Sequence, residues 1–188
     1  APKRLPNALN ETEAVRLVLP ADPSTERSAA ESGMAAARDQ AMFEVLYGCG
    51  IRIGELIGLD VASVDLRAAE MRVFGKGRKE RIVPLGGPAK QALRAWLDER
   101  EKFLTAPGRD EAALFLGQRG ERISAAVVRR ALRARAVERG IASHVYPHRL
   151  RHSFASHVLQ SSGDLRGVQE LMGHASIAST QVYTHLDF

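Results

Sequence analysis

The 188-residue chain is a series of short segments in which apolar residues recur at helical spacing. Glycine or proline residues lie between many of these segments. This punctuation predicts a succession of short helices. The Gly48-Cys49-Gly50 break predicts a tight corner between two of them, and Asn10 with Glu13 predicts a capping box on a first short helix. The other predicted helices cover residues 34–47, 52–59, 88–104, 124–139, 147–160, 165–172 and 177–185.

Two extended runs interrupt the helical pattern. Residues 71–74 and 81–85 flank the segment Gly75-Lys-Gly-Arg-Lys-Glu80 and predict a two-stranded hairpin with Lys76 at its tip. Residues 20–33 are polar and predict a loop. The predicted fold class is therefore mainly α with a small antiparallel β-hairpin or sheet (α+β), in a single domain over residues 1–188.

Composition excludes several classes of protein. Hydrophobic residues make up 45% of the chain and charge is spread along it, which is typical of one globular domain and not of a disordered or fibrous chain. The lone Cys49 cannot form an internal disulfide, so a disulfide-stapled secreted module is excluded. No apolar run approaches membrane-spanning length and the first residues lack the apolar core of a signal peptide, so we expect a cytoplasmic protein.

Positive charge is concentrated in one stretch. The whole chain has 27 Lys+Arg against 22 Asp+Glu, a net charge of +5, whereas residues 119–152 hold nine arginines against two glutamates, a local balance of +7 that leaves −2 for the rest. Within it, Arg129, Arg130 and Arg133 project from one side of a predicted helix and are candidate contacts to DNA phosphates. A solvated helix face is the alternative interpretation.

His148 and His152 have the i, i+4 spacing that a zinc site on a helix would use. A zinc helix of that kind needs a carboxylate beside its ligands, but here Arg149 and Arg151 would place positive charge next to the ion. We therefore predict no metal site. Arg151 instead lies one turn from His148 on the same helix face, and a fixed cation beside an imidazole is an anion site.

The polar residues around this anion site supply the groups that phosphodiester transfer needs without a metal. They are two arginines, two histidines, a lysine and a tyrosine: Arg52, Lys76, His148, Arg151, His174 and Tyr183. Guanidinium groups can neutralise the charge that a phosphodiester gains under attack, and a phenol assisted by a positive field and a nearby base can be the nucleophile. A lysine on a hairpin tip can protonate the leaving 5′ oxygen. Each residue alone also has an ordinary interpretation, such as a surface ion pair between Arg52 and Glu55.

The order and spacing of these residues together are more specific. The segments that carry them are Gly48-Cys-Gly-Ile-Arg52-Ile-Gly-Glu55-Leu, Gly75-Lys76-Gly-Arg-Lys-Glu-Arg-Ile-Val-Pro-Leu, Pro147-His148-Arg-Leu-Arg151-His-Ser-Phe-Ala, Leu171-Met-Gly-His174 and Thr180-Gln-Val-Tyr183-Thr-His. With these segments the chain resembles the catalytic domain of the tyrosine recombinase (phage integrase) family, from Leu5 to Phe188. Its tail from Ser161 to His174 is most similar to the Xer subgroup, in its XerC-type branch.

The resemblance implies a role for each residue that matches a family motif. By position, Arg52 and Arg151 correspond to the two arginines that clamp the phosphate, and Lys76 corresponds to the general acid on the hairpin. His148 and His174 correspond to the pair that manages protons and binds phosphate.

The resemblance also implies Tyr183 as the nucleophile, which forms a 3′-phosphotyrosine and frees a 5′-hydroxyl, with Glu55 as an acidic residue that supports the first arginine. It implies no cofactor. The implied partners are a double-stranded DNA recombination site, a sister XerD-like recombinase in a heterotetramer on that DNA, and a septal DNA translocase. The implied role is site-specific recombination in the resolution of bacterial chromosome dimers, in the nucleoid.

Three features depart from the family pattern. The family's N-terminal DNA-clamping domain is not in this sequence, the sequence ends five residues after Tyr183 where relatives usually continue into a helix, and the 20–33 loop is longer than usual. We expect the chain to be the catalytic part of a longer protein. Three other functions stay open: a phage or transposon integrase of the same family, a DNA-binding regulator with this fold but without the chemistry, and a metal-dependent nuclease, for which paired carboxylates are lacking.

Overall fold

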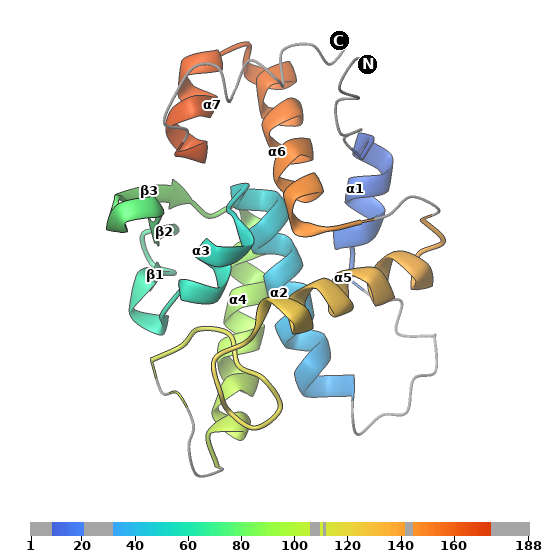
Figure 1. Cartoon of the computed structure of the whole chain (residues 1–188), viewed down its shortest axis with the longest axis vertical. Coiled ribbons are helices and arrows are strands. Elements are labelled where there is room, and N and C mark those ends of the chain that lie inside the picture. The colour runs from blue at the N-terminus through green and yellow to red at the C-terminus, as the bar shows by residue number, and fades with distance from the viewer. Residues whose placement is uncertain (1–8, 21–31, 106–109, 111, 142–144, 174–188) are drawn as a thin grey trace.

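The computed structural model describes residues 9–20, 32–105, 110, 112–141 and 145–173. It is mostly helical, as predicted, and contains one small sheet (Figure 1). The helices are α1 (Glu11–Val18), α2 (Ser32–Cys49), α3 (Ile53–Gly58), α4 (Gly87–Arg100), α5 (Ala125–Glu138), α6 (Pro147–Ser162) and α7 (Leu165–Met172). Short 3-10 turns cover Val61–Ser63, Lys76–Arg78 and Glu101–Thr105. None of the described helices is long and apolar enough to span a membrane.

Helix α2 lies at the centre of the fold, where it packs against α1, α4 and α6 (Figure 1). Met42, Phe43 and Leu46 of α2 are at most 1% exposed, and burying a side chain of this size stabilises a fold by about 1.5–3 kcal/mol. On α4, Trp96 stacks on Phe115 with 6.3 Å between ring centroids, and its Nε1 donates to the carbonyl of Leu114 at 2.8 Å. The core thus joins the first helices to the segment that precedes α5.

The sheet is antiparallel, with strands in the order β1 (Val64–Asp65), β2 (Glu70–Phe74) and β3 (Glu80–Pro84). Side chains alternate along the strands, so Val73 and Val83 are buried while Phe74 and Ile82 are exposed. Strands β2 and β3 form the predicted hairpin, and β1 was not predicted because two residues are too few to give a pattern. The sheet contacts α3 through β2 and α7 through β3. The hairpin therefore connects the helices that flank the candidate site.

The corner predicted at Gly48–Gly50 is confirmed, and it requires glycine at its last position. Gly50 has a φ of +63°, in the left-handed region that L side chains rarely adopt. A Cβ at Gly50 would lie 2.1 Å from Cδ1 of Phe154, so the chain passes directly over an aromatic ring of α6. The corner thus places the chain just before α3 in contact with α6.

Local signals located most helix ends within a few residues. The capping box at α1 is present, with Asn10 Oδ1 accepting from the N–H of Glu13 at 2.8 Å. The predicted helix 88–104 is α-helical to Arg100 and then continues as the 3-10 turn Glu101–Thr105. The predicted helix 177–185 lies outside the described residues, as does residue range 21–31 of the predicted loop.

Candidate functional site

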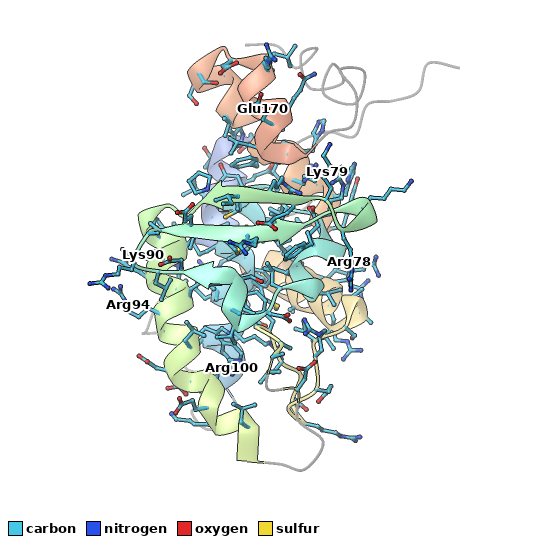
Figure 2. The ribbon with its side chains drawn as sticks, turned by 90° about the vertical axis from the view of Figure 1, so that its left-hand side faces the viewer. Arg78, Lys79, Lys90, Arg94, Arg100 and Glu170 are labelled. Carbon is cyan, nitrogen blue, oxygen red and sulfur yellow. The ribbon has the colours of Figure 1, made fainter. Side chains whose placement is uncertain are left out.

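The structure describes four of the six candidate residues, and His174 and Tyr183 lie outside the described residues. Arg52 and Lys76 line one cavity of about 710 Å³ between α3, the hairpin tip and the end of α7. The side chain of Arg52 is 45% exposed, and Lys76 is exposed at the tip, as predicted. The lining is Arg52, Glu55, Gly75, Lys76, Lys79, Glu80, Arg81, Gln169, Glu170 and Gly173. Figure 2 shows Arg78 and Lys79 at the tip, Glu170 on α7, and Lys90 and Arg94 away from it on α4.

Glu55 is the centre of the site. Its side chain is 5% exposed, and its oxygens accept from both terminal nitrogens of Arg81 and from the backbone N–H of Arg52, the latter at 2.8 Å. Arg151 Nη1 lies 3.8 Å from Oε1, and Arg52 Nη1 lies 3.9 Å from Oε2. Burial acts to raise the pKa of Glu55, but the bonds from Arg81 and Arg52 and the charges of Arg81 and Arg151 outweigh it, so the pKa is lowered. The carboxylate is therefore held ionised among three guanidinium groups.

Arg151 joins two distant segments to this carboxylate. Its side chain is only 2% exposed, and it donates from Nη1 to the carbonyl of Gly50 and from Nη2 to the carbonyl of Met172, each at 2.5 Å. Arg151 thus ties the corner before α3 to the end of α7. The structure brings Arg52 and Arg151, which are far apart in the sequence, to the same carboxylate.

His148 lies on the first turn of α6, one turn before Arg151. Partial burial lowers the pKa of His148, and the positive charges of Arg151 and then Arg52 lower it further. The imidazole is therefore held mainly neutral near neutral pH, a state in which one nitrogen accepts a proton and the other donates one. The i, i+3 spacing of His148 and Arg151 predicted this proximity.

His152, the other histidine of the predicted i, i+4 pair, is part of the core. It is 1% exposed, and its pKa is lowered to about 4, first by burial and then by the charges of His148 and Arg149. In the described part of the chain, no group of three or more His, Cys, Asp or Glu side chains is arranged to hold a metal ion.

Much of the arginine charge in residues 119–152 is directed inward. Arg122 donates to the carbonyls of Ile57 and Leu59 at 2.9 and 3.0 Å and pairs with Asp60 at 2.6 Å. Arg135, Arg149 and Arg151 are at most 9% exposed. The local balance of +7 therefore overstates the exposed charge. The predicted DNA contacts on α5 are all exposed: Arg129, Arg130 and Arg133.

Arg81 is a residue of the cavity lining that sequence reasoning missed. It lies in β3 on the same inward face as Val83, yet it is charged, and a charged residue facing inward needs a partner. The strand alternation gave this signal, but the sequence did not say that Glu55 is the partner. The protein is thus a mainly helical domain with a cavity at which Arg and Lys side chains lie around a buried carboxylate. This arrangement is suited to binding a phosphate group.

Comparison with known proteins agrees with this class. Residues 24–188 match the model of the Phage integrase family, and the chain belongs to that family. It is 47% identical over 186 residues to Tyrosine recombinase XerC of Alcanivorax borkumensis, covering 99% of this chain and 58% of the relative. It is 52% identical over 153 residues to Tyrosine recombinase XerC of an Escherichia coli strain, covering 81% of this chain and 50% of the relative.

Two solved structures are similar across almost the whole chain. The XerA recombinase superposes with a TM-score of 0.80 at 36% identity, covering 97% of this chain and 62% of that one. The XerH site-specific recombinase, bound to a difH substrate in a pre-cleavage complex, superposes with a TM-score of 0.80 at 29% identity, covering 97% of this chain and 51% of that one. The chain therefore spans about half the length of the curated relatives it matches.

Proposed function

We propose that the protein is a site-specific DNA recombinase that cuts and rejoins DNA through a covalent 3′-phosphotyrosine, in the resolution of bacterial chromosome dimers. One observation carries the proposal: Arg52 and Arg151 meet at the buried Glu55, beside the cavity that Lys76 lines. The names of the XerC relatives support the same activity, and the XerH neighbour is bound to a recombination-site substrate. We propose that residues 1–188 are the catalytic part of this enzyme.

In the proposed reaction, the phenol oxygen of Tyr183 attacks the scissile phosphorus. A P–O bond to the tyrosine forms as the bond to the 5′ oxygen breaks, and the leaving oxygen takes a proton from Lys76. Arg52 and Arg151 stabilise the charge that develops on the non-bridging oxygens, and removing one such donor typically costs about 100- to 1,000-fold in rate. The phosphotyrosine keeps the bond energy, so rejoining by a 5′-hydroxyl needs no nucleotide.

The two histidines and the lysine have complementary tasks. His148, kept mainly neutral by its surroundings, can accept the phenol proton or donate to a phosphate oxygen. We propose that His174, which directly follows Gly173 at the end of α7, binds the same phosphate. Lys76 is exposed on the hairpin tip, from which it can approach a bound DNA backbone.

The partners follow from the same proposal. We infer that the protein binds a double-stranded recombination site, with Arg129, Arg130 and Arg133 contacting its phosphates, and acts in a heterotetramer with a sister XerD-like recombinase. A septal DNA translocase is the proposed regulator, and the bacterial nucleoid in the cytoplasm is the proposed place of action. The two XerC relatives favour this chromosomal role over that of a mobile-element integrase.

The test is a covalent trap with the protein at its full natural length. The probe is a pool of nicked duplexes with randomised arms, incubated with protein in EDTA, and protein-linked DNA is recovered after denaturation and sequenced. We expect a denaturation-resistant adduct with wild type and none with Tyr183→Phe. No adduct with wild type, or an adduct that persists in Tyr183→Phe, would refute the nucleophile assignment.

Two further results would identify a different function. Cleavage that requires an added divalent metal would support a nuclease. Tight binding of the duplex without any adduct would support a DNA-binding regulator.

A further inference from the structure

Arg81 uses one side chain to contact two helices. Its side chain is 13% exposed and points inward from β3. Nη2 lies 3.0 Å from Oε1 of Glu55, Nη1 binds Oε2 of the same carboxylate, and Nε donates to the carbonyl of Leu171 at 2.9 Å. The planar guanidinium thus links the hairpin to α3 and to α7.

The end of α7 depends on such donors. The last carbonyls of a helix have no partner within the helix, and here Leu171 receives Arg81 while Met172 receives Arg151. Both cations also face the negative end of the helix dipole. Gly173 follows with a φ of +65°, and a Cβ there would lie 2.9 Å from Nη1 of Arg81, so the guanidinium is in close contact with the backbone.

We propose that Arg81 is a positioning residue for strand transfer, which holds Glu55, and through it Arg52, in register with the end of α7 and with the hairpin that carries Lys76. This inference rests on the proposed function. Arg81 lines the cavity but acts through other residues and not on the phosphate, because all three of its guanidinium nitrogens are directed at Glu55 and Leu171. Residue 174, proposed to bind phosphate, follows the end of α7 directly.

Only arginine has the shape for this task. Its fork offers two parallel N–H groups to a carboxylate while Nε remains for a third acceptor, whereas lysine has a single nitrogen on a flexible stem. Without Arg81, Glu55 would keep the backbone N–H of Arg52 and the more distant guanidinium groups of Arg52 and Arg151, at 3.9 and 3.8 Å. The carboxylate would then be free to turn or to take up a proton.

The experiment compares Arg81→Gln and Arg81→Lys with wild type at full natural length. Single-turnover cleavage and the equilibrium Kd are measured on a nicked duplex that carries the sequence recovered in the trap. A matched control is Arg72→Gln, which removes an arginine from the outer face of the same hairpin, where it is 56% exposed and pairs with Glu80. We expect Arg81→Gln to lower the cleavage rate about 100-fold, the usual cost of a displacement of about 1 Å in a site, with Kd changed by less than about 3-fold. Arg81→Lys is expected not to restore the rate, and Arg72→Gln to cleave as wild type does.

A pH profile separates positioning from general loss of structure. The charged groups that face Glu55 from the described elements around it are Arg52 of α3, Arg81 of β3 and Arg151 of α6. In Arg81→Gln, burial is no longer offset by the fork, so Glu55 protonates at higher pH than in wild type. The ratio of variant to wild-type cleavage rate should therefore fall as the pH is lowered. A variant that is only partly unfolded would lose the same fraction of activity at every pH.

A second variant protects the test against a folding defect. Arg81→Gln leaves Glu55 charged and poorly paired, whereas the double variant Arg81→Gln/Glu55→Gln removes the buried charge, and its thermal stability should exceed that of Arg81→Gln. Its cleavage rate should nevertheless stay low. Wild-type cleavage by folded Arg81→Gln, full rescue by Arg81→Lys, or parallel losses in rate and Kd would each overturn the positioning role. No adduct with wild type would instead refute the proposed function and the inference with it.

Discussion

Gly50→Ala perturbs the corner on which both arginines depend, and the structure gives its cost. Gly50 has a φ of +63°, and an L side chain in the left-handed conformation costs about 1–2 kcal/mol. The added Cβ would lie 2.1 Å from Cδ1 of Phe154, so the ring must move, and such overpacking costs roughly 1–3 kcal/mol. The expected loss is therefore roughly 2–5 kcal/mol, out of the roughly 5–15 kcal/mol that stabilises a typical domain.

The assay is urea unfolding followed by the fluorescence of Trp96, which is the one tryptophan of the sequence and is fully buried. The matched control is Gly54→Ala in α3, where a Cβ would meet nothing within 4 Å. Because alanine is favoured over glycine inside a helix, the control should be unchanged or more stable by about 0.5–1 kcal/mol. In a Phe154→Ala background, Gly50→Ala should cost only the backbone part, which a double-mutant cycle measures.

The same variant should also affect function, because the Gly50 carbonyl accepts a bond from Arg151. We expect Gly50→Ala to lower cleavage more than its folded fraction explains. A stability within about 0.5 kcal/mol of wild type would show that the corner relaxes freely and that the reasoning from φ and contact is wrong. If Gly50→Ala costs as much free energy in the Phe154→Ala background as in wild type, the contact with the Phe154 ring contributes nothing, and only the backbone part of the argument stands.

Three other variants test separate features. Arg151→Ala should lower cleavage about 100- to 1,000-fold with a smaller change in Kd, and equal losses would make it a binding residue. Replacing the three exposed arginines of α5, namely Arg129, Arg130 and Arg133, with glutamine should weaken DNA binding and flatten its salt dependence, and an unchanged slope in binding titrations would mark a solvated face. His152 has a folded pKa of about 4, below its ordinary value of 6.5, so the unfolded state binds a proton first as the pH falls. Stability should therefore fall by up to about 3 kcal/mol from pH 6.5 to pH 4. Urea melts of wild type against His152→Gln at both pH values measure this, and equal pH dependence would contradict it.

Local interactions made much of the fold predictable. The capping box joins Asn10 to Glu13, and the Gly48–Gly50 corner depends on its own glycines. Each feature can therefore be predicted from a few neighbouring residues. The i, i+3 pair of His148 and Arg151 is equally local, and the charge of Arg151 contributes to the lowered pKa of His148.

Long-range pairings were not predictable in the same way. Arg81 and Glu55 are 26 residues apart, and no local pattern names one as the partner of the other. The arginines of residues 119–152 show the same limit, because the two backbone carbonyls that accept from Arg122 lie more than 60 residues earlier in the chain. A guanidinium suits both an exposed phosphate contact and a buried carbonyl contact, and only tertiary packing decides between them.

Glu55 explains how three guanidinium groups stay close together without DNA. Like charges in a partly buried site repel one another, and the carboxylate offsets this because it contacts Arg81 directly and lies within 4 Å of Arg52 and Arg151. One negative charge among three positive ones leaves this cluster of four side chains with a net positive charge, which favours a phosphodiester nearby. Because the pKa of Glu55 is lowered, its contribution to stability is fully present above the ordinary glutamate pKa of 4.5 and is lost only as the pH falls through the folded pKa. In the proposed reaction, the arginines are therefore in place before DNA binds, and little reorganisation is needed when charge develops on the phosphate.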